Sequence, residues 1–118
     1  MKSKFNNILE MVGNTPVLKI NKIDTGKCDL YVKMESLNPF GSIKDRVGLK
    51  MIQDAEIQGQ IREGSTIIES TAGNTGLGLA LAAKLKGYKL ILVIPDKMSE
   101  EKIRPVSYTH LRAHETEE

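Results

Sequence analysis

Three glycines in one short stretch are the first feature of this sequence that could do chemistry. Residues 70–78 read Ser-Thr-Ala-Gly-Asn-Thr-Gly-Leu-Gly and lead from an apolar segment into a predicted helix. Such a turn gathers backbone N–H groups at the positive end of the helix dipole, where phosphate or carboxylate binds. The glycine order differs from the dinucleotide fingerprint G-x-G-x-x-G, and no Lys-Ser/Thr pair follows. The loop is therefore either an anion site or only a tight turn that lets the helix pack closely.

A lysine at the start of another predicted helix is the second candidate. Lys44 follows the turn-forming segment 38–43 and precedes Asp45 and Arg46. In the first turn of a helix a cation opposes the dipole, which favours the neutral amine. A neutral, partly buried amine is what Schiff-base chemistry requires. The alternative is a solvated lysine that pairs with Asp45 or another acid.

The other residues that could be reactive give weaker evidence of a function. Gly13-Asn14-Thr15-Pro16 by itself predicts only a turn. Cys28 is interpreted as a thiol without a nucleophilic role, because the chain has no histidine before position 106. His110 and His114 are four residues apart, and Glu115 follows, but no third zinc ligand is obvious. We therefore predict no metal site.

The elements that must position these residues alternate between strands and helices. In chain order we expect a helix over Phe5–Met11, strands at Pro16–Ile20 and Leu30–Met34, a helix over Ile43–Gln58, a strand at Ser65–Glu69, a helix over Asn74–Lys86, a strand at Lys89–Ile94 and a helix capped by Ser99. This order predicts βαβ units and an α/β fold with a parallel sheet.

The two longer helices differ in their apolar pattern. The helix over 43–58 is expected to bury one stripe, made of Val47, Met51, Ile52 and Ala55. The helix over 74–86 is apolar nearly all round, which is typical of a helix buried against a sheet. The aliphatic run 89–94 is typical of a strand inside a parallel sheet.

Length and composition exclude several classes of protein. The chain has 118 residues, a formal charge of +2, 40% hydrophobic and 27% charged residues, as in an ordinary globular domain. It has no run of basic residues, so we expect no nucleic-acid partner. The longest aliphatic stretch, 90–94, is too short to cross a bilayer, so we expect no membrane partner. A single cysteine suits the reducing cytoplasm, where we expect the protein to reside.

Three motifs are more informative in combination than they are singly. They are Gly13-Asn14-Thr15-Pro16, the spaced set Lys33, Glu35, Asn38-Pro39, Gly41-Ser42 and Lys44-Asp45-Arg46, and Thr71-Ala72-Gly73-Asn74-Thr75-Gly76. In order and spacing this combination resembles the cysteine synthase and cystathionine β-synthase family, enzymes of the tryptophan-synthase-β fold type that use pyridoxal 5′-phosphate (PLP). The likeness runs over residues 5–105. It implies the truncated N-terminal part of a two-domain fold type II PLP enzyme.

The resemblance also implies roles for individual residues. Lys44 would attach PLP and act as the catalytic base, and Asn74 would hydrogen-bond the cofactor's ring hydroxyl. The substrate carboxylate would be held by Thr71, Ala72, Gly73, Asn74 and Thr75. Ala72 stands where many members carry serine, so one hydrogen bond worth about 1 kcal/mol is lost while the backbone N–H remains.

The implied activity is β-replacement on O-acetylserine or serine, with sulfide as acceptor and cysteine as product. The alternatives are a cystathionine β-synthase that uses homocysteine, and a serine or threonine dehydratase-like PLP lyase. A third, from another class, is a non-catalytic module whose glycine loop only captures an anion. The resemblance further suggests that the full-length enzyme is a homodimer.

The end of the chain differs in character from the rest. Residues 106–116 resemble the translation of a transposase adapter used in shotgun sequencing. We therefore expect residues 1–105 to be the N-terminal fragment of a PLP-dependent catalytic unit and residues 106–118 to be a non-native tail. The loop that binds the cofactor phosphate in this family is expected to lie outside these residues, so we expect the isolated chain to be inactive.

Overall fold

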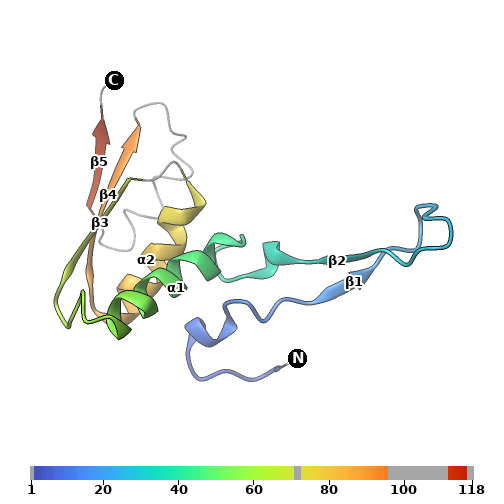
Figure 1. The fold of residues 1–118 in the computed structure, drawn as a ribbon, viewed down its shortest axis with the longest axis horizontal. Helices are drawn as coiled ribbons and strands as arrows, with labels where there is room; N and C mark the ends of the chain where they lie inside the picture. The colour runs from blue at the N-terminus through green and yellow to red at the C-terminus, as the bar shows by residue number, and fades with distance from the viewer. Residues whose placement is uncertain (1, 71–72, 96–111, 117–118) are drawn as a thin grey trace.

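The computed structural model describes residues 2–70, 73–95 and 112–116, the last of these by backbone alone (Figure 1). Its elements, with η for a short 3-10 helix, are η1 (Ile8–Met11), β1 (Val17–Lys19), β2 (Tyr31–Lys33), η2 (Glu35–Leu37), α1 (Lys44–Ile57), β3 (Thr66–Ser70), α2 (Asn74–Lys86), β4 (Lys89–Pro95) and β5 (Arg112–Thr116).

A parallel sheet with helices on one side forms the larger part of the molecule. Strand β3 pairs with β4, from Thr66 opposite Lys89 to Ser70 opposite Val93, and β4 pairs with β5 on its other edge. Both pairs are parallel, which confirms the predicted α/β fold. Strand β5 lies within residues 106–118, for which the sequence pattern predicts no element. Figure 1 shows α2 between the sheet and α1.

Helix α2 and strand β4 supply most of the core. Every residue from Leu79 to Ala83 is buried, and so are Leu90, Leu92 and Ile94, which alternate along β4. Burial of one such large aliphatic side chain contributes about 1.5–3 kcal/mol. The helix has the bounds that its apolar run predicts and is buried against the sheet as expected. Within the described residues, no helix is long and apolar enough to cross a membrane.

The two helices cross at a pair of glycines. A Cβ on Gly48 would lie 2.6 Å from the carbonyl oxygen of Gly78, and a Cβ on Gly78 would lie 2.8 Å from the carbonyl carbon of Lys44. Real Cβ atoms do not approach so closely, so only glycine allows the two backbones to come into contact. The contact brings the start of α1 against the second turn of α2.

This crossing corrects the predicted apolar stripe of α1. The buried face consists of Asp45, Gly48 and Ile52, whereas Met51 is 41% exposed and the other two predicted members are half-buried. The prediction weighed side-chain hydrophobicity alone. The helix instead packs closest where it has no side chain, and this turns Met51 outward.

Strands β1 and β2 form an antiparallel pair apart from the main sheet. They pair from Val17 opposite Lys33 to Lys19 opposite Tyr31, and Figure 1 shows them as an arm extending away from the helices. All their residues are exposed. The sequence places both strands, but each is shorter than predicted, and it does not indicate their antiparallel pairing.

The first predicted helix is reduced to the four residues of η1. Asn7 caps it, since its side chain accepts from the amide of Leu9 at 2.7 Å, and Glu10 accepts from the amides of Asn6 and Asn7. This capping box fixes the start only a few residues before the Gly13-Asn14 turn. The segment is therefore too short for the α-helix predicted over Phe5–Met11.

Candidate active site

The loop before α1 is held by side chains on both sides. The side-chain amide of Asn38 donates to the carbonyl of Ser42 at 2.9 Å, and the Ser42 hydroxyl accepts from the backbone amide of Lys44 at 3.1 Å. The amide of Phe40 donates to the carboxylate of Asp45 at 2.6 Å. Lys44 is the first residue of α1, in the first turn as predicted.

The side chain of Lys44 is exposed, which differs from the partly buried amine expected from the sequence, and it is unpaired with acids in the described part of the chain. Asp45, its expected partner in the non-catalytic alternative, is only 1% exposed and bonds the loop instead. Burial raises the pKa of this carboxyl above its ordinary value of 3.8. A surface ion pair between Lys44 and Asp45 is therefore excluded.

Lys44 lies next to α2 although the two are thirty residues apart in sequence. A Cβ on Gly78 would lie 3.1 Å from the Cα of Asp45 and even closer to the carbonyl of Lys44. Gly78 is in the second turn of α2, which begins at Asn74. The structure therefore brings together the two features that the sequence singled out, the lysine and the glycine-bearing helix start.

The start of α2 is suited to an anion. Gly73 is its N-cap, and no side chain among the described residues caps it, while the Gly73 carbonyl accepts from the amides of Gly76 and Leu77. The first turn of this fully described helix contains no acid, and Lys84 and Lys86 stand in its last turn. Without an acid in the first turn, the positive end of the helix dipole is not offset by a side chain of the helix, while the two lysines stabilise the opposite end.

The predicted binding residues are only partly described. Asn74 is exposed on the first position of α2, and Thr75 and Gly73 are half-buried beside it. Thr71 and Ala72 lie outside the described residues. The roles predicted for all five stay predictions, and the structure adds that three of them share the start of one helix.

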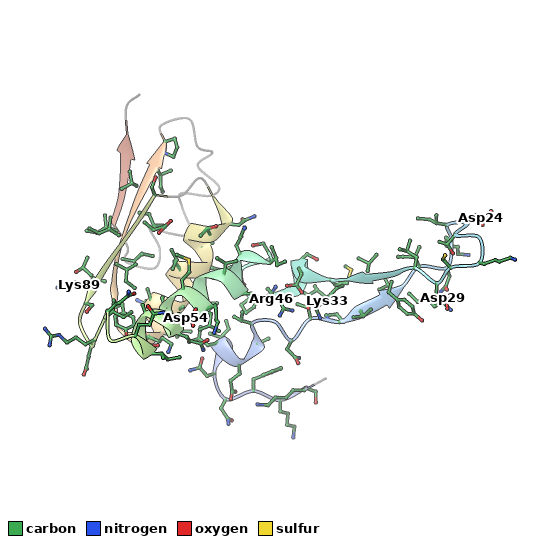
Figure 2. All side chains as sticks on the ribbon, in the orientation of Figure 1. Asp24, Asp29, Lys33, Arg46, Asp54 and Lys89 are labelled. Atoms are coloured by element: carbon green, nitrogen blue, oxygen red, sulfur yellow. The ribbon has the colours of Figure 1, made fainter. Side chains whose placement is uncertain are left out.

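The first turn of α1 is held by an ion pair that the sequence analysis did not identify. Arg46 contacts Glu35 in a two-pronged pair, with Nε to Oε1 at 2.5 Å and Nη2 to Oε2 at 3.0 Å. The hydroxyl of Thr15 also donates to Glu35. Hydrogen bonds from Arg46 and Thr15 lower the pKa of Glu35 from 4.5 to about 2. Figure 2 shows Arg46 where the β1–β2 arm meets the helices.

The same network reaches the N-terminal turn and the loop before Lys44. Arg46 donates to the carbonyl of Gly13 at 2.9 Å, and the amide of Gly13 donates to Asn38 at 2.7 Å. Gly13 has a positive φ of 82°, and a Cβ there would lie 2.7 Å from Arg46 Nη1. Glu35, Asn38 and Arg46 belong to the motifs that carry the resemblance. Their spacing marked them as significant, but spacing alone did not reveal that they bond to one another.

The described residues contain no group of three His, Cys, Asp or Glu side chains that could hold a metal ion. Cys28 is exposed. His110 and the side chain of His114 lie outside what the structure describes.

The described residues fit a carbonyl cofactor together with an amino acid. Lys44 offers an amine free of acidic partners, and its backbone is seated on Gly78 where a Cβ would otherwise fill the space. A carboxylate bound at the start of α2 would lie within a few residues of that seat. This arrangement suits attachment of PLP at Lys44 and binding of a substrate carboxylate at Gly73–Thr75.

Known proteins similar to this chain agree with that chemistry. Residues 8–116 match the family described as pyridoxal-phosphate dependent enzyme. The chain is 58% identical over 99 residues to the cysteine synthase of a Flavobacterium species, of which those residues cover 32%. It is 56% identical over 99 residues to the cystathionine β-synthase of Apis mellifera, with coverage of 20%. These matches involve 84% and 81% of this chain.

Solved structures with this fold include enzymes of amino-acid and sulfur chemistry. A hydrogen sulfide-producing enzyme from Fusobacterium nucleatum superposes with a TM-score of 0.92 at 45% identity, over 99% of this chain and 39% of that one. An O-ureido-L-serine synthase gives a TM-score of 0.89 at 36% identity, over 97% of this chain and 36% of that one. The chain thus spans between a fifth and two fifths of these proteins.

Proposed function

Because this chain belongs to the pyridoxal-phosphate dependent enzyme family, we propose that it supplies the lysine and the carboxylate site of a β-replacement enzyme. The reaction would convert O-acetylserine or serine, with sulfide as acceptor, to cysteine. One observation carries the proposal: the backbone at the start of α1, with Lys44, is seated on Gly78 in the second turn of α2, close to the glycine-bearing start of that helix. An amine and an anion site are the two groups that such a reaction needs side by side.

The residues of this chain would bind, orient and move a proton. Lys44 would hold PLP and then take the proton from the substrate Cα as general base. The start of α2 would hold the α-carboxylate and thereby fix the direction of the Cα–H bond, which is catalysis by orientation. Asn74, exposed at that start, would donate to the ring hydroxyl. Bound PLP supplies an electron sink for the charge left on Cα.

A second acceptor has specific support. The cystathionine β-synthase of Apis mellifera is almost as similar to this chain as the cysteine synthase of the Flavobacterium species, at 56% against 58% identity. Homocysteine is therefore the second candidate acceptor. Membership of an enzyme family disfavours the non-catalytic anion-binding module. The dehydratase-like reaction remains a third candidate, because it would use the same lysine.

Activity is proposed for the longer enzyme and not for the 118 residues by themselves. The chain covers 32% of the Flavobacterium cysteine synthase. PLP also needs a phosphate site and a partner for its ring nitrogen, and we propose that other parts of the enzyme provide both. On the resemblance alone, we propose a cytoplasmic homodimer.

Product analysis of the full-length enzyme tests the proposal. The enzyme, loaded with PLP, is incubated with O-acetylserine and sulfide, and separately with serine and homocysteine, and the products are identified by mass spectrometry. We expect cysteine from the first mixture at the higher rate. Cystathionine as the main product would favour the second acceptor. Neither product, from protein shown to contain PLP, would contradict the proposal.

A further inference from the structure

The residue after Lys44 is the most deeply buried charged group that the structure describes. Asp45 is 1% exposed, on the face of α1 that otherwise consists of Gly48 and Ile52. One carboxylate oxygen, Oδ2, accepts from the amide of Phe40 at 2.6 Å. The other, Oδ1, is buried without any hydrogen-bond partner in the described part of the chain.

This arrangement is costly, and packing does not explain it. A buried polar atom without a partner loses its hydration and gains nothing in exchange, typically about 1–3 kcal/mol. An apolar residue would suit a helix face packed on α2 better. Burial, together with the negative charge of Glu35, raises the pKa of Asp45 above its ordinary value, while the bond from the Phe40 amide lowers it. Within the described residues, its bond to the Phe40 amide is the one hydrogen bond that offsets this cost.

That bond ties the loop to the crossing of the two helices. Phe40 lies four residues before Lys44, and its side chain packs against the core. The Cα of Asp45 lies 3.1 Å from the position that a Cβ on Gly78 would occupy. One side chain therefore connects the loop before Lys44 with the place where Lys44 meets α2. Asn38 also holds the loop, at Ser42, but from the Glu35–Arg46 side.

We propose that Asp45 is a positioning residue whose buried side chain, through its bond to the Phe40 amide, keeps Lys44 seated beside the start of α2. The inference rests on the proposed role of Lys44. Asp45 contacts neither substrate nor cofactor, and it acts only through the loop. Only its acceptor oxygen is required, so Asp45→Asn, which keeps an oxygen of the same reach, should preserve the function.

Four forms of the full-length enzyme test this: wild type, Asp45→Ala, Asp45→Asn and Asp54→Ala. Asp54 is a matched control, because it is a half-buried aspartate on the same helix that pairs with Lys50 at 2.9 Å (Figure 2). The first readout is amide hydrogen exchange in the peptide that contains Phe40. The second is the fraction of Lys44 that carries PLP after borohydride reduction. The third is kcat and KM for the amino-acid substrate.

We expect Asp45→Ala to speed exchange at Phe40 about tenfold, because an amide that loses its acceptor opens more easily. Attachment of PLP at Lys44 should fall, and kcat should fall about tenfold or more, with KM changed less because the carboxylate site on α2 is untouched. Asp45→Asn and Asp54→Ala should resemble the wild type in all three readouts.

Three results would overturn the inference. In the first, Asp45→Ala leaves amide exchange at Phe40 and PLP attachment at Lys44 at wild-type levels, and Lys44 of the wild type carries PLP. The inference about Asp45 would then be wrong, and the proposed function would be unaffected. If Asp45→Ala does not fold, Asp45→Asn provides the test. Slow exchange at Phe40 together with lost PLP attachment at Lys44 in that variant would show that the Asp45–Phe40 bond does not position Lys44. No PLP on Lys44 of the wild type would remove both the proposed function and this inference.

Discussion

The two long helices begin in opposite ways. The start of α1 is held by side chains: Asn38 and Asp45 bind the loop, and Arg46 is paired with Glu35. The start of α2 has a glycine as its N-cap, no acid in its first turn and no capping side chain from the described residues. An amine that must meet a cofactor needs a fixed position, whereas an anion site needs backbone amides at the positive end of a helix dipole. The difference therefore matches the two proposed tasks.

The helices also differ in what surrounds them. Helix α2 is buried from Leu79 to Ala83, while α1 buries only Asp45, Gly48 and Ile52. We expect substitutions near the start of α1 to alter chemistry first and stability second. Substitutions in the buried part of α2 should do the reverse. The predictions below test this contrast.

The largest effect is expected from Lys44→Ala in the full-length enzyme. Turnover should fall at least about a thousandfold, because the chemistry would lose both its attachment point and its base. The melting temperature should change little, since the side chain is exposed. Lys50→Ala is the matched control, an exposed lysine on the same helix, and should keep full turnover. Substantial β-replacement by Lys44→Ala would remove α1 from the proposed chemistry.

Gly78→Ala should break the contact that joins the two helix starts. The added Cβ would overlap the backbone carbonyl of Lys44, so the helices must move apart, at a cost of about 1–3 kcal/mol or more. Urea unfolding measures the loss of stability, and turnover should fall with it. Lys84→Ala, at an exposed position of α2, should stay within about 0.5 kcal/mol of the wild type. Equal stability of the two variants would mean that the crossing is looser than described.

The Glu35–Arg46 pair should make the free energy of unfolding depend on pH in the acidic range. The pKa of Glu35 is about 2 when folded, against an ordinary value of 4.5, so its stabilisation is complete above pH 4.5 and is lost as the pH falls toward 2. Urea unfolding of wild type and Glu35→Gln should therefore give a difference that shrinks across this range. Glu63→Gln, at an exposed position, is the control. A difference that is constant between pH 5 and pH 2 would contradict this role of the pair.

Asn74→Ala should have the smallest effect of these substitutions, and it tests whether the start of α2 contributes to cofactor binding. Loss of one neutral hydrogen bond costs about 1 kcal/mol, so PLP should bind about fivefold more weakly. Titration of the apo-enzyme with PLP measures the change. Gln53→Ala, which removes an exposed amide from α1, should bind PLP as the wild type does. Equal affinity in the two variants would remove Asn74 from the cofactor site.

Local features of the fold could be predicted from the sequence. The bounds of α2 follow from its apolar run and from Gly87, which ends it with a φ of 81°. Strands β3 and β4 follow from short aliphatic runs, and their order with α2 predicts parallel pairing. Lys44 could be placed at a helix start because a turn-forming segment precedes it. Each of these signals lies within a few residues of the element that it predicts.

Contacts between distant residues could not be predicted in the same way. The crossing of Gly48 and Gly78 joins residues thirty apart, and hydrophobic patterning gives no weight to a residue without a side chain. For the same reason, the prediction that Met51 belongs to the buried stripe of α1 was wrong. Asp45 looked like a partner for its neighbour Lys44, yet burial against α2 directs it to Phe40. In the candidate site, the sequence identified the lysine and the glycine-bearing helix start, and the structure showed that the backbone of Lys44 lies against the second turn of that helix.

The most direct test of the central claim is a crystal structure of the full-length enzyme with PLP and a substrate analogue that has the carboxylate but lacks the amino group. We predict that PLP is bonded to Nζ of Lys44 and that the carboxylate accepts hydrogen bonds of about 3 Å from backbone amides at the start of α2. PLP on another lysine, or the carboxylate bound away from the start of α2, would contradict the account.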